Sequence, residues 1–163
     1  MNTGIIIMGA ILIAICVIPI ILMNKSRANK GRRILESITN YAAQFNCTIT
    51  EHEFCGDFII GIDKEKRVAF FIKQVDENSA MQHIELAEVK SCKIVNYGRT
   101  VKGNGSSTKV IDRLALNFIL PESKGQNMEW ELYNSEKSPQ LTGELQAIEK
   151  WQAIIDEQIL KKK

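Results

Sequence analysis

The chain has 163 residues, 45% of them hydrophobic, with 21 Lys and Arg against 19 Asp and Glu. This length suits one folded domain beside a short terminal segment. Five basic residues precede Ile34 and every acid follows it, so residues 34–163 carry 16 basic residues against 19 acids, a net charge of −3. That balance argues against nucleic-acid binding, because a binding face normally shows as a basic patch within the folded part.

Residues 1–23 are predicted to form a transmembrane anchor. The twenty positions from Gly4 to Met23 carry no charge and are mostly Ile, Leu, Val, Met and Ala, and a helix of that length spans the ~30 Å hydrocarbon core of a bilayer. A cleaved signal peptide is disfavoured because the segment lacks a basic start and an Ala-x-Ala site. A lipoprotein needs a small residue before its cysteine, whereas Ile15 precedes Cys16. A buried core helix is rarely so long without a charge.

A basic collar follows the anchor, and its cations are expected to contact the membrane surface. They are Lys25, Arg27, Lys30, Arg32 and Arg33. Lys and Arg beside a span stay in the cytoplasm, so we predict a single-pass protein with its N-terminus outside and its C-terminal domain in the cytoplasm. Each cation near anionic headgroups contributes about 1 kcal/mol of binding. The lipid bilayer is therefore one predicted partner.

Residues 24–45 are expected to form this collar and a short connecting helix. Between Arg32 and Phe45, apolar residues recur every three or four positions, which is the period of a helix with one buried face. They are Ile34, Leu35, Ile38, Ala42 and Phe45. Asn46 is suited to end this helix.

Residues 46–163 are expected to form the cytoplasmic domain, and its first half has the two-residue period of strands. Apolar residues alternate through Phe58–Ile62 and again through Val68–Ile72, and the polar residues Asp63–Lys66 between them predict a hairpin turn. A short strand over Cys47–Glu53 is predicted before this pair. A further strand is predicted over Ile84–Tyr97, which is rich in β-branched residues.

The second half predicts another hairpin and a long closing helix. Leu114–Leu120 and Met128–Leu132 alternate clearly, and Pro121–Gln126 between them has turn composition. Ser138 and Pro139 are suited to an N-cap and a first helical turn, although Gly143 argues for a later start. One apolar face then follows at helical spacing: Leu141, Leu145, Ile148, Trp151, Ile155 and Ile159.

The predicted domain is α+β and mainly β, with six or seven antiparallel strands in an open sheet or barrel closed by the C-terminal helix. This order, from about Phe54 to Asn134 with the helix around Trp151, resembles pleckstrin-homology-like (PH-like) domains of small bacterial membrane-anchored proteins. In those proteins an Ile-Gly-Ile-Asp strand end, here Ile60–Asp63, precedes a Lys/Glu turn, and a strand like Leu86–Val95 follows. The resemblance implies a location in the bacterial inner (plasma) membrane and assigns no role to any residue.

The PH-like resemblance raises the question of anion binding, since lipid-binding members place several Lys or Arg between the first two strands. The corresponding turn mixes Lys64, Lys66 and Arg67 with two acids, which favours a solvated hairpin. A second candidate is the stretch from residue 99 to 109, where backbone amides of a Gly-rich loop would form an anion nest. Its residues are Arg99, Lys102, Gly103, Gly105 and Lys109. A plain connecting loop is the competing interpretation.

Neither a cofactor, a metal site nor a catalytic centre is predicted. Cys47, His52 and Cys55 lack zinc-ligand spacing and a fourth ligand, and Cys47 and Cys92 are expected to lie in the core as free thiols. His52 and His83 belong to no recognisable acid–base motif, and His83 is expected to face solvent. The predicted function is therefore a non-catalytic binding or scaffolding module for another membrane or cytoplasmic protein. The alternative is an anionic-lipid or small-anion sensor that uses the 99–109 loop.

Overall fold

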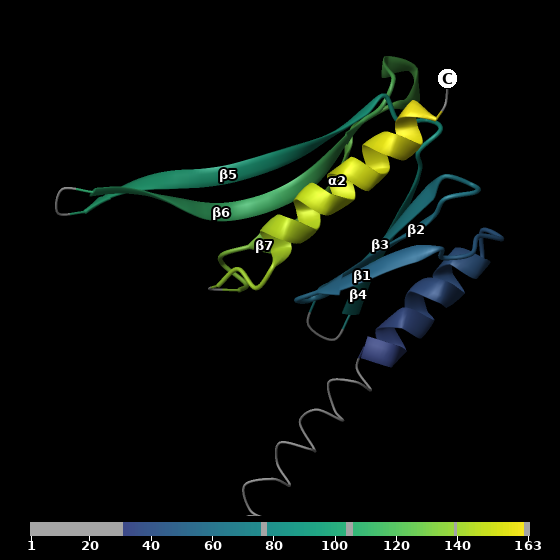
Figure 1. The fold of residues 1–163 in the computed structure, drawn as a ribbon, viewed down its shortest axis with the longest axis horizontal. Coiled ribbons are helices and arrows are strands. Elements are labelled where there is room, and N and C mark those ends of the chain that lie inside the picture. Colours follow the sequence, from purple (N-terminus) through teal and green to yellow (C-terminus); the bar gives the residue numbers. More distant parts are fainter. Residues whose placement is uncertain (1–30, 76–77, 104–105, 139, 162–163) are drawn as a thin grey trace, which may run out of the picture. The chain divides into compact units, whose positions relative to one another are not determined.

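The structure is a computed structural model that describes residues 31–75, 78–103, 106–138 and 140–161. The chain divides into two compact units, Met1–Ser37 and Ile38–Lys163. The second unit is an α+β domain of two antiparallel sheets and a C-terminal helix (Figure 1). The predicted fold class is confirmed at this level.

The first sheet contains four strands in the order β1-β2-β3-β4. They are β1 (Glu51–Cys55), β2 (Phe58–Asp63), β3 (Val68–Val75) and β4 (Asn78–Glu85). The predicted β2–β3 hairpin is confirmed, with Asp63 paired to Val68 across its turn. Every residue of β2 is buried, so this strand is covered on both faces of the sheet.

Two strand predictions around this sheet are wrong. The strand predicted over Cys47–Glu53 begins at Glu51 instead. The single strand predicted over Ile84–Tyr97 is divided, because residues 86–88 form a turn between β4 and the next strand. Most of β4 was therefore missed, since Ser79–His83 has no alternation of apolar and polar residues.

The second sheet has the order β5-β6-β7. Its strands are β5 (Ser91–Gly103), β6 (Ser106–Ile119) and β7 (Met128–Asn134), with a 3-10 turn, η1 (Glu122–Lys124), before β7. The predicted hairpin over 114–132 is confirmed as the β6–β7 pair. Because β7 pairs with β6 only over Arg113–Phe118, the β5–β6 hairpin extends past the end of β7 (Figure 1).

A single helix, α2 (Glu144–Leu160), closes the described domain. Its late start after Gly143 agrees with the prediction, but Ser138 is not its N-cap, and Pro139 lies outside the described residues. The Glu144 carboxylate turns back and accepts hydrogen bonds from the Thr142 amide at 2.5 Å and the Thr142 hydroxyl at 2.9 Å. These bonds stabilise a non-helical approach to α2, so the helix cannot begin near residue 139.

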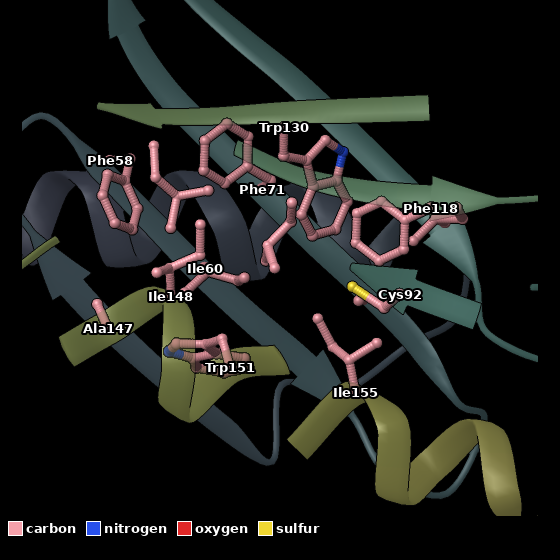
Figure 2. Packing of buried hydrophobic residues seen from close by; sticks show 14 of the residues in the cluster. Phe58, Ile60, Phe71, Cys92, Phe118, Trp130, Ala147, Ile148, Trp151 and Ile155 are labelled. Atoms are coloured by element: carbon pink, nitrogen blue, oxygen red, sulfur yellow. The ribbon is translucent and has the colours of Figure 1, made fainter. Parts of the chain in front are cut away.

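The core lies between the two sheets and α2. Trp130 of β7 stacks on Phe71 of β3 with ring centroids 5.2 Å apart, and Phe118 of β6 meets the same indole edge-on at 4.6 Å (Figure 2). From α2, Trp151 and Ile155 are completely buried against this cluster. The predicted apolar stripe is thus confirmed within α2, where it fills the space between the sheets. Leu141 is the exception, since it precedes the helix and is exposed.

The first sheet has a second apolar layer on the face opposite the core. The predicted helix over 32–45 is confirmed over residues 31–43. A turn over residues 44–46 follows the helix and ends at Asn46, whose φ is +56° while the Cys47 amide donates to the Ala42 carbonyl at 3.0 Å. Of this helix, Ile38 and Ala42 belong to the second unit and are completely buried.

Gly61 in the centre of β2 allows this close approach. A Cβ atom at Gly61 would lie 3.2 Å from the Ile38 Cδ1 atom and 3.2 Å from the Ile49 Cγ2 atom. Contacts that tight force neighbouring side chains to shift. The Ile-Gly-Ile-Asp strand end therefore has a structural explanation: its isoleucines are buried, and its glycine admits the side chains of the outer layer.

Candidate functional site

The predicted membrane-contacting residues are described only in part. The proposed span and three collar residues, Lys25, Arg27 and Lys30, lie outside the described residues. Arg32 and Arg33 lie exposed in the helix over residues 31–43. Among the residues whose structure is described, no helix is long and apolar enough to cross a bilayer.

The stretch predicted to be an anion-binding loop forms a β-hairpin instead. Arg99–Gly103 and Ser106–Lys109 are paired strands, with Thr100 opposite Lys109 and Gly103 opposite Ser106. Only residues 104 and 105 separate the strands, and they lie outside the described residues, as do the side chains of Lys102 and Lys109. In a paired strand successive amides point in opposite directions, toward and away from the partner strand. The paired part of this stretch therefore does not converge its amides on one point, as an anion nest requires.

The remaining predicted cation of that stretch, Arg99, has an acidic partner. Its Nε atom lies 3.4 Å from the Asp112 carboxylate across the β5–β6 hairpin. The hairpin contains a bulge at Tyr97 and Gly98, where an added Cβ at Gly98 would lie 2.7 Å from the Val110 carbonyl oxygen. Arg99 is thus part of a strand surface and contributes no free charge to a loop.

In the turn between β2 and β3, two of the three predicted cations are engaged. Lys64 forms an ion pair with Glu51 at 2.6 Å, and Lys66 donates a hydrogen bond to the Asn46 carbonyl. The buried Asp63 organises the turn by accepting hydrogen bonds from the amides of Glu65 and Lys66. These partners match the solvated-hairpin interpretation better than a headgroup site.

A polar cavity of about 330 Å³ lies at one end of the domain, beside Lys73 of β3. The lysine is only 6% exposed. Other lining residues come from the β1–β2 turn, β7 and the segment before α2. They include Asp57, Asn134, Lys137, Thr142 and Glu144.

Lys73 in this cavity is paired with carboxylates, and Glu144 is bonded to Thr142. The Lys73 ammonium lies 3.2 Å from the Glu131 carboxylate, donates to the Glu131 carbonyl at 3.0 Å and lies 4.0 Å from Asp57. Burial alone would raise the pKa of Glu131, but Lys73, Asn134 and Arg113 outweigh it and hold that pKa below its usual range. The lysine is therefore a structural link between the two sheets, without an unpaired charge to offer a ligand.

The residues considered as metal ligands are not gathered into a site. Cys47 is buried, while His52 is exposed on β1. Burial and the neighbouring Glu144, Glu53 and Asp57 raise the pKa of the Cys55 thiol to about 11, and burial raises that of Cys92 to about 12. Within the described ranges, no three His, Cys, Asp or Glu residues are placed to hold a metal ion.

Edge strands β1 and β7 and the start of β5 carry groups that bond to side chains of other elements, and the β5–β6 hairpin beyond β7 carries the charged pair Arg99 and Asp112. On β1, Glu53 accepts hydrogen bonds from Lys150 and the Trp151 indole of α2. On β7, the Glu131 carbonyl is bound by Lys73, and on β5, the Cys92 carbonyl accepts a bond from Gln152 at 3.2 Å. Such side chains hinder pairing with a foreign strand.

Edge strand β4 lacks these protections. It pairs with β3 over all eight residues without a bulge, and Ser79–Ile84 contains no Lys, Arg, Asp, Glu or Pro. A long, regular and uncharged edge is a template for another strand. We call the outer side of β4 the β4 edge.

The hydrogen-bonding register identifies which groups the β4 edge offers. The Leu86 amide donates to the Arg67 carbonyl at 2.8 Å, in register with the β3–β4 pairs. In an antiparallel ladder, alternate residues direct both backbone groups toward the partner strand. Ile84, Gln82 and Ala80 therefore face β3, and Ser79, Met81 and His83 direct both N–H and C=O outward. The carbonyl of Glu85 already accepts a hydrogen bond from the Glu88 amide at 3.0 Å.

Apolar and aromatic side chains flank these outward groups. The His83 ring lies 4.0 Å from the Phe45 ring between centroids, and its Nδ1 atom lies 2.9 Å from the Tyr41 hydroxyl oxygen. Phe45 is 40% exposed and Met81 is 44% exposed. The prediction that His83 faces solvent is therefore wrong, because residues of the preceding helix and its C-terminal turn cover its ring.

Comparison of this chain with protein-family models, curated proteins and solved structures finds no match. The function is therefore inferred from geometry. The Lys73 ammonium is paired with Glu131, whereas the β4 edge combines outward backbone groups with exposed Met81 and Phe45. Sequence reasoning missed this edge because β4 lacks the alternation by which strands are recognised. The absence of charge over Ser79–Ile84 is the one sequence signal that was present.

Proposed function

We propose that this protein is a single-pass membrane protein whose cytoplasmic PH-like domain binds another polypeptide without catalysis. The uncharged stretch from Gly4 to Met23 and the basic collar after it support the anchor and its orientation. The succession of a four-stranded sheet, a three-stranded sheet and a closing helix supports the PH-like assignment. A location in the bacterial inner membrane rests on the same resemblance.

The β4 edge is the observation that carries the binding proposal. A partner strand would satisfy the outward N–H and C=O groups of Ser79, Met81 and His83, as in recognition by β-strand addition. Side chains of Met81 and Phe45 would add apolar contact beside the ladder. Anchoring favours such weak pairing because it confines both partners to one surface.

The alternative of an anionic-lipid or small-anion sensor has less support. It relied on a loop over residues 99–109, and the described part of that stretch is a paired hairpin. Lys64 and Arg99, from the two candidate sites, face Glu51 and Asp112. No arrangement among the described residues favours this second function.

Site-specific photocrosslinking of the full-length protein in cells tests the binding proposal. A photoreactive amino acid at the exposed Ser79 is expected to give discrete covalent adducts. The matched control places it at Glu149, which is equally exposed on α2. Met81→Lys, which puts a charge on the edge as natural edge strands do, is expected to abolish the adducts from position 79. Equal labelling from both positions, or adducts that survive Met81→Lys, would contradict binding at the β4 edge.

A further inference from the structure

We propose that the strand paired with β4 is the β4 strand of a second copy of this chain. This inference rests on the proposed binding function and names the partner of the same edge. Two copies would join their first sheets into one eight-stranded antiparallel sheet about a two-fold axis. Such an interface is isologous, so the same residues serve both sides.

The charge pattern of β4 suits pairing with itself. A strand that carries several charges of one sign would repel its own copy, because like charges directly opposite each other are destabilising. Between Ser79 and Ile84 there is no Asp, Glu, Lys or Arg. Glu85 is the one acid in Asn78–Glu85, and it stands at the end of the strand.

The outward groups restrict the register of this pairing. Ser79, Met81 and His83 must lie opposite outward-facing residues of the second copy in hydrogen-bonded pairs. A two-fold axis through Gln82 pairs Met81 with His83 of the second copy and Ser79 with Glu85. The two Met81–His83 pairs carry the ladder, because the Glu85 carbonyl is already bonded to the Glu88 amide. In this register the serine hydroxyl can donate to a carboxylate, and no two acids of β4 lie opposite each other.

The same register covers the exposed apolar groups beside the edge. Met81 and His83 lie on the face of the sheet that carries Phe45, because they pair with Ile72 and Phe70 of that face. Met81 of one copy, 44% exposed, would therefore lie beside the Phe45–His83 ring pair of the other. Contacts between a thioether and an aromatic ring contribute about 0.3–1.5 kcal/mol each.

The symmetry is also compatible with two anchors in one membrane. A two-fold axis perpendicular to the joined sheet keeps equivalent faces on the same side. Helix residues such as Ile38 and Ala42 cover one face of the first sheet. The two helix-covered faces would therefore lie on the same side of the joined sheet.

Cysteine crosslinking of the full-length protein in membranes tests the inference. At the axis, Gln82 would face itself in a non-hydrogen-bonded pair with Cα atoms about 4.5 Å apart, within the range of about 4.4–6.8 Å that a disulfide requires. Gln82→Cys is expected to give an oxidised band of twice the chain mass. The unmodified chain and Glu149→Cys, exposed on α2, are expected to lack it, and Met81→Lys added to Gln82→Cys is expected to remove it.

The outcomes separate this inference from the proposed function. If Gln82→Cys gives a dimer band no stronger than that of Glu149→Cys, the partner strand does not come from a second copy. If position 79 nevertheless crosslinks to a different polypeptide, binding at the β4 edge stands and only the identity of the partner was wrong. If neither crosslink forms, both proposals fail. Urea unfolding of Gln82→Cys, monitored by tryptophan fluorescence, verifies that the substituted chain is folded.

Discussion

Replacing Asp63 with alanine is expected to lower the free energy of unfolding by about 3 kcal/mol, because it removes a charged acceptor from several amides at once. Its side chain is 3% exposed. It accepts hydrogen bonds from the Thr48 amide at 2.7 Å, the Glu65 amide at 3.0 Å and the Lys66 amide at 2.9 Å. The carboxylate thus fixes both the β2–β3 turn and the segment that leads into β1.

Urea unfolding of the full-length protein in detergent, monitored by tryptophan fluorescence, measures this loss of unfolding free energy. Glu65→Ala is the matched control, because Glu65 is exposed in the same turn and surface substitutions usually change stability by less than about 0.5 kcal/mol. If Asp63→Ala unfolds at the same urea concentration as Glu65→Ala, the turn does not depend on this carboxylate.

The stabilising effect of Asp63 should also depend on pH. Burial would raise the pKa of this carboxyl, but hydrogen bonds from Lys66, Thr48 and Glu65 outweigh burial and lower it. A folded-state pKa below the unfolded value of about 3.9 gives stability that is present above pH 4 and is lost as pH falls through the folded pKa. Asp63→Asn should therefore lose less stability than the unmodified protein between pH 5 and 3. Equal losses in both proteins would contradict this role.

Replacing Lys73 with methionine is expected to cost about 2 kcal/mol, since it removes a buried charged donor from both the carbonyl and the carboxylate of Glu131, while the carboxylate keeps Arg113 at 2.7 Å. Methionine retains most of the buried stem, so the loss reports on the charge. The ammonium binds both the carboxylate and the carbonyl of Glu131. It therefore links β3 of the first sheet to β7 of the second.

A double-substitution cycle separates the ion pair from packing. Glu131→Met in the Lys73→Met background should recover at least part of the loss, because apolar replacement of both partners is often neutral or stabilising. Urea midpoints of the two single variants and the double variant provide the coupling free energy. Additive effects of the two substitutions would show that Lys73 and Glu131 do not stabilise the domain as a pair.

Elements with a clear hydrophobic period were predictable from the sequence. The β2–β3 and β6–β7 hairpins alternate because each strand has residues that face the core, and α2 has one apolar stripe because one side fills the space between the sheets. The end of the first helix was predictable as well, because Asn46 tolerates the left-handed conformation that the chain adopts there.

Features that depend on distant backbone pairing were not predictable. The 99–109 stretch has the composition of a loop, yet its backbone pairs along a two-stranded hairpin. The β4 strand escaped recognition for a related reason. Its residue His83 is partly covered by Tyr41 and Phe45, which come from a helix and the turn after it, about forty residues earlier.

The candidate sites were predicted least well, because they combine residues remote in sequence. Lys73 and Glu131 are 58 positions apart, and no local spacing relates them. Gly-rich and basic composition pointed to residues 99–109, although Arg99 is paired with Asp112. The β4 edge exists because no other described strand pairs with the outer side of β4, and strand pairing of this kind cannot be read from the sequence.

The proposed anchor is tested most directly by alkaline carbonate extraction of membranes that contain the full-length chain with a C-terminal reporter. We expect the protein to stay in the membrane pellet and the reporter to lie in the cytoplasm, because an uncharged segment of twenty residues precedes a basic collar. An intact product that washes into the supernatant, or a reporter found outside the cell, would contradict a membrane-anchored cytoplasmic domain.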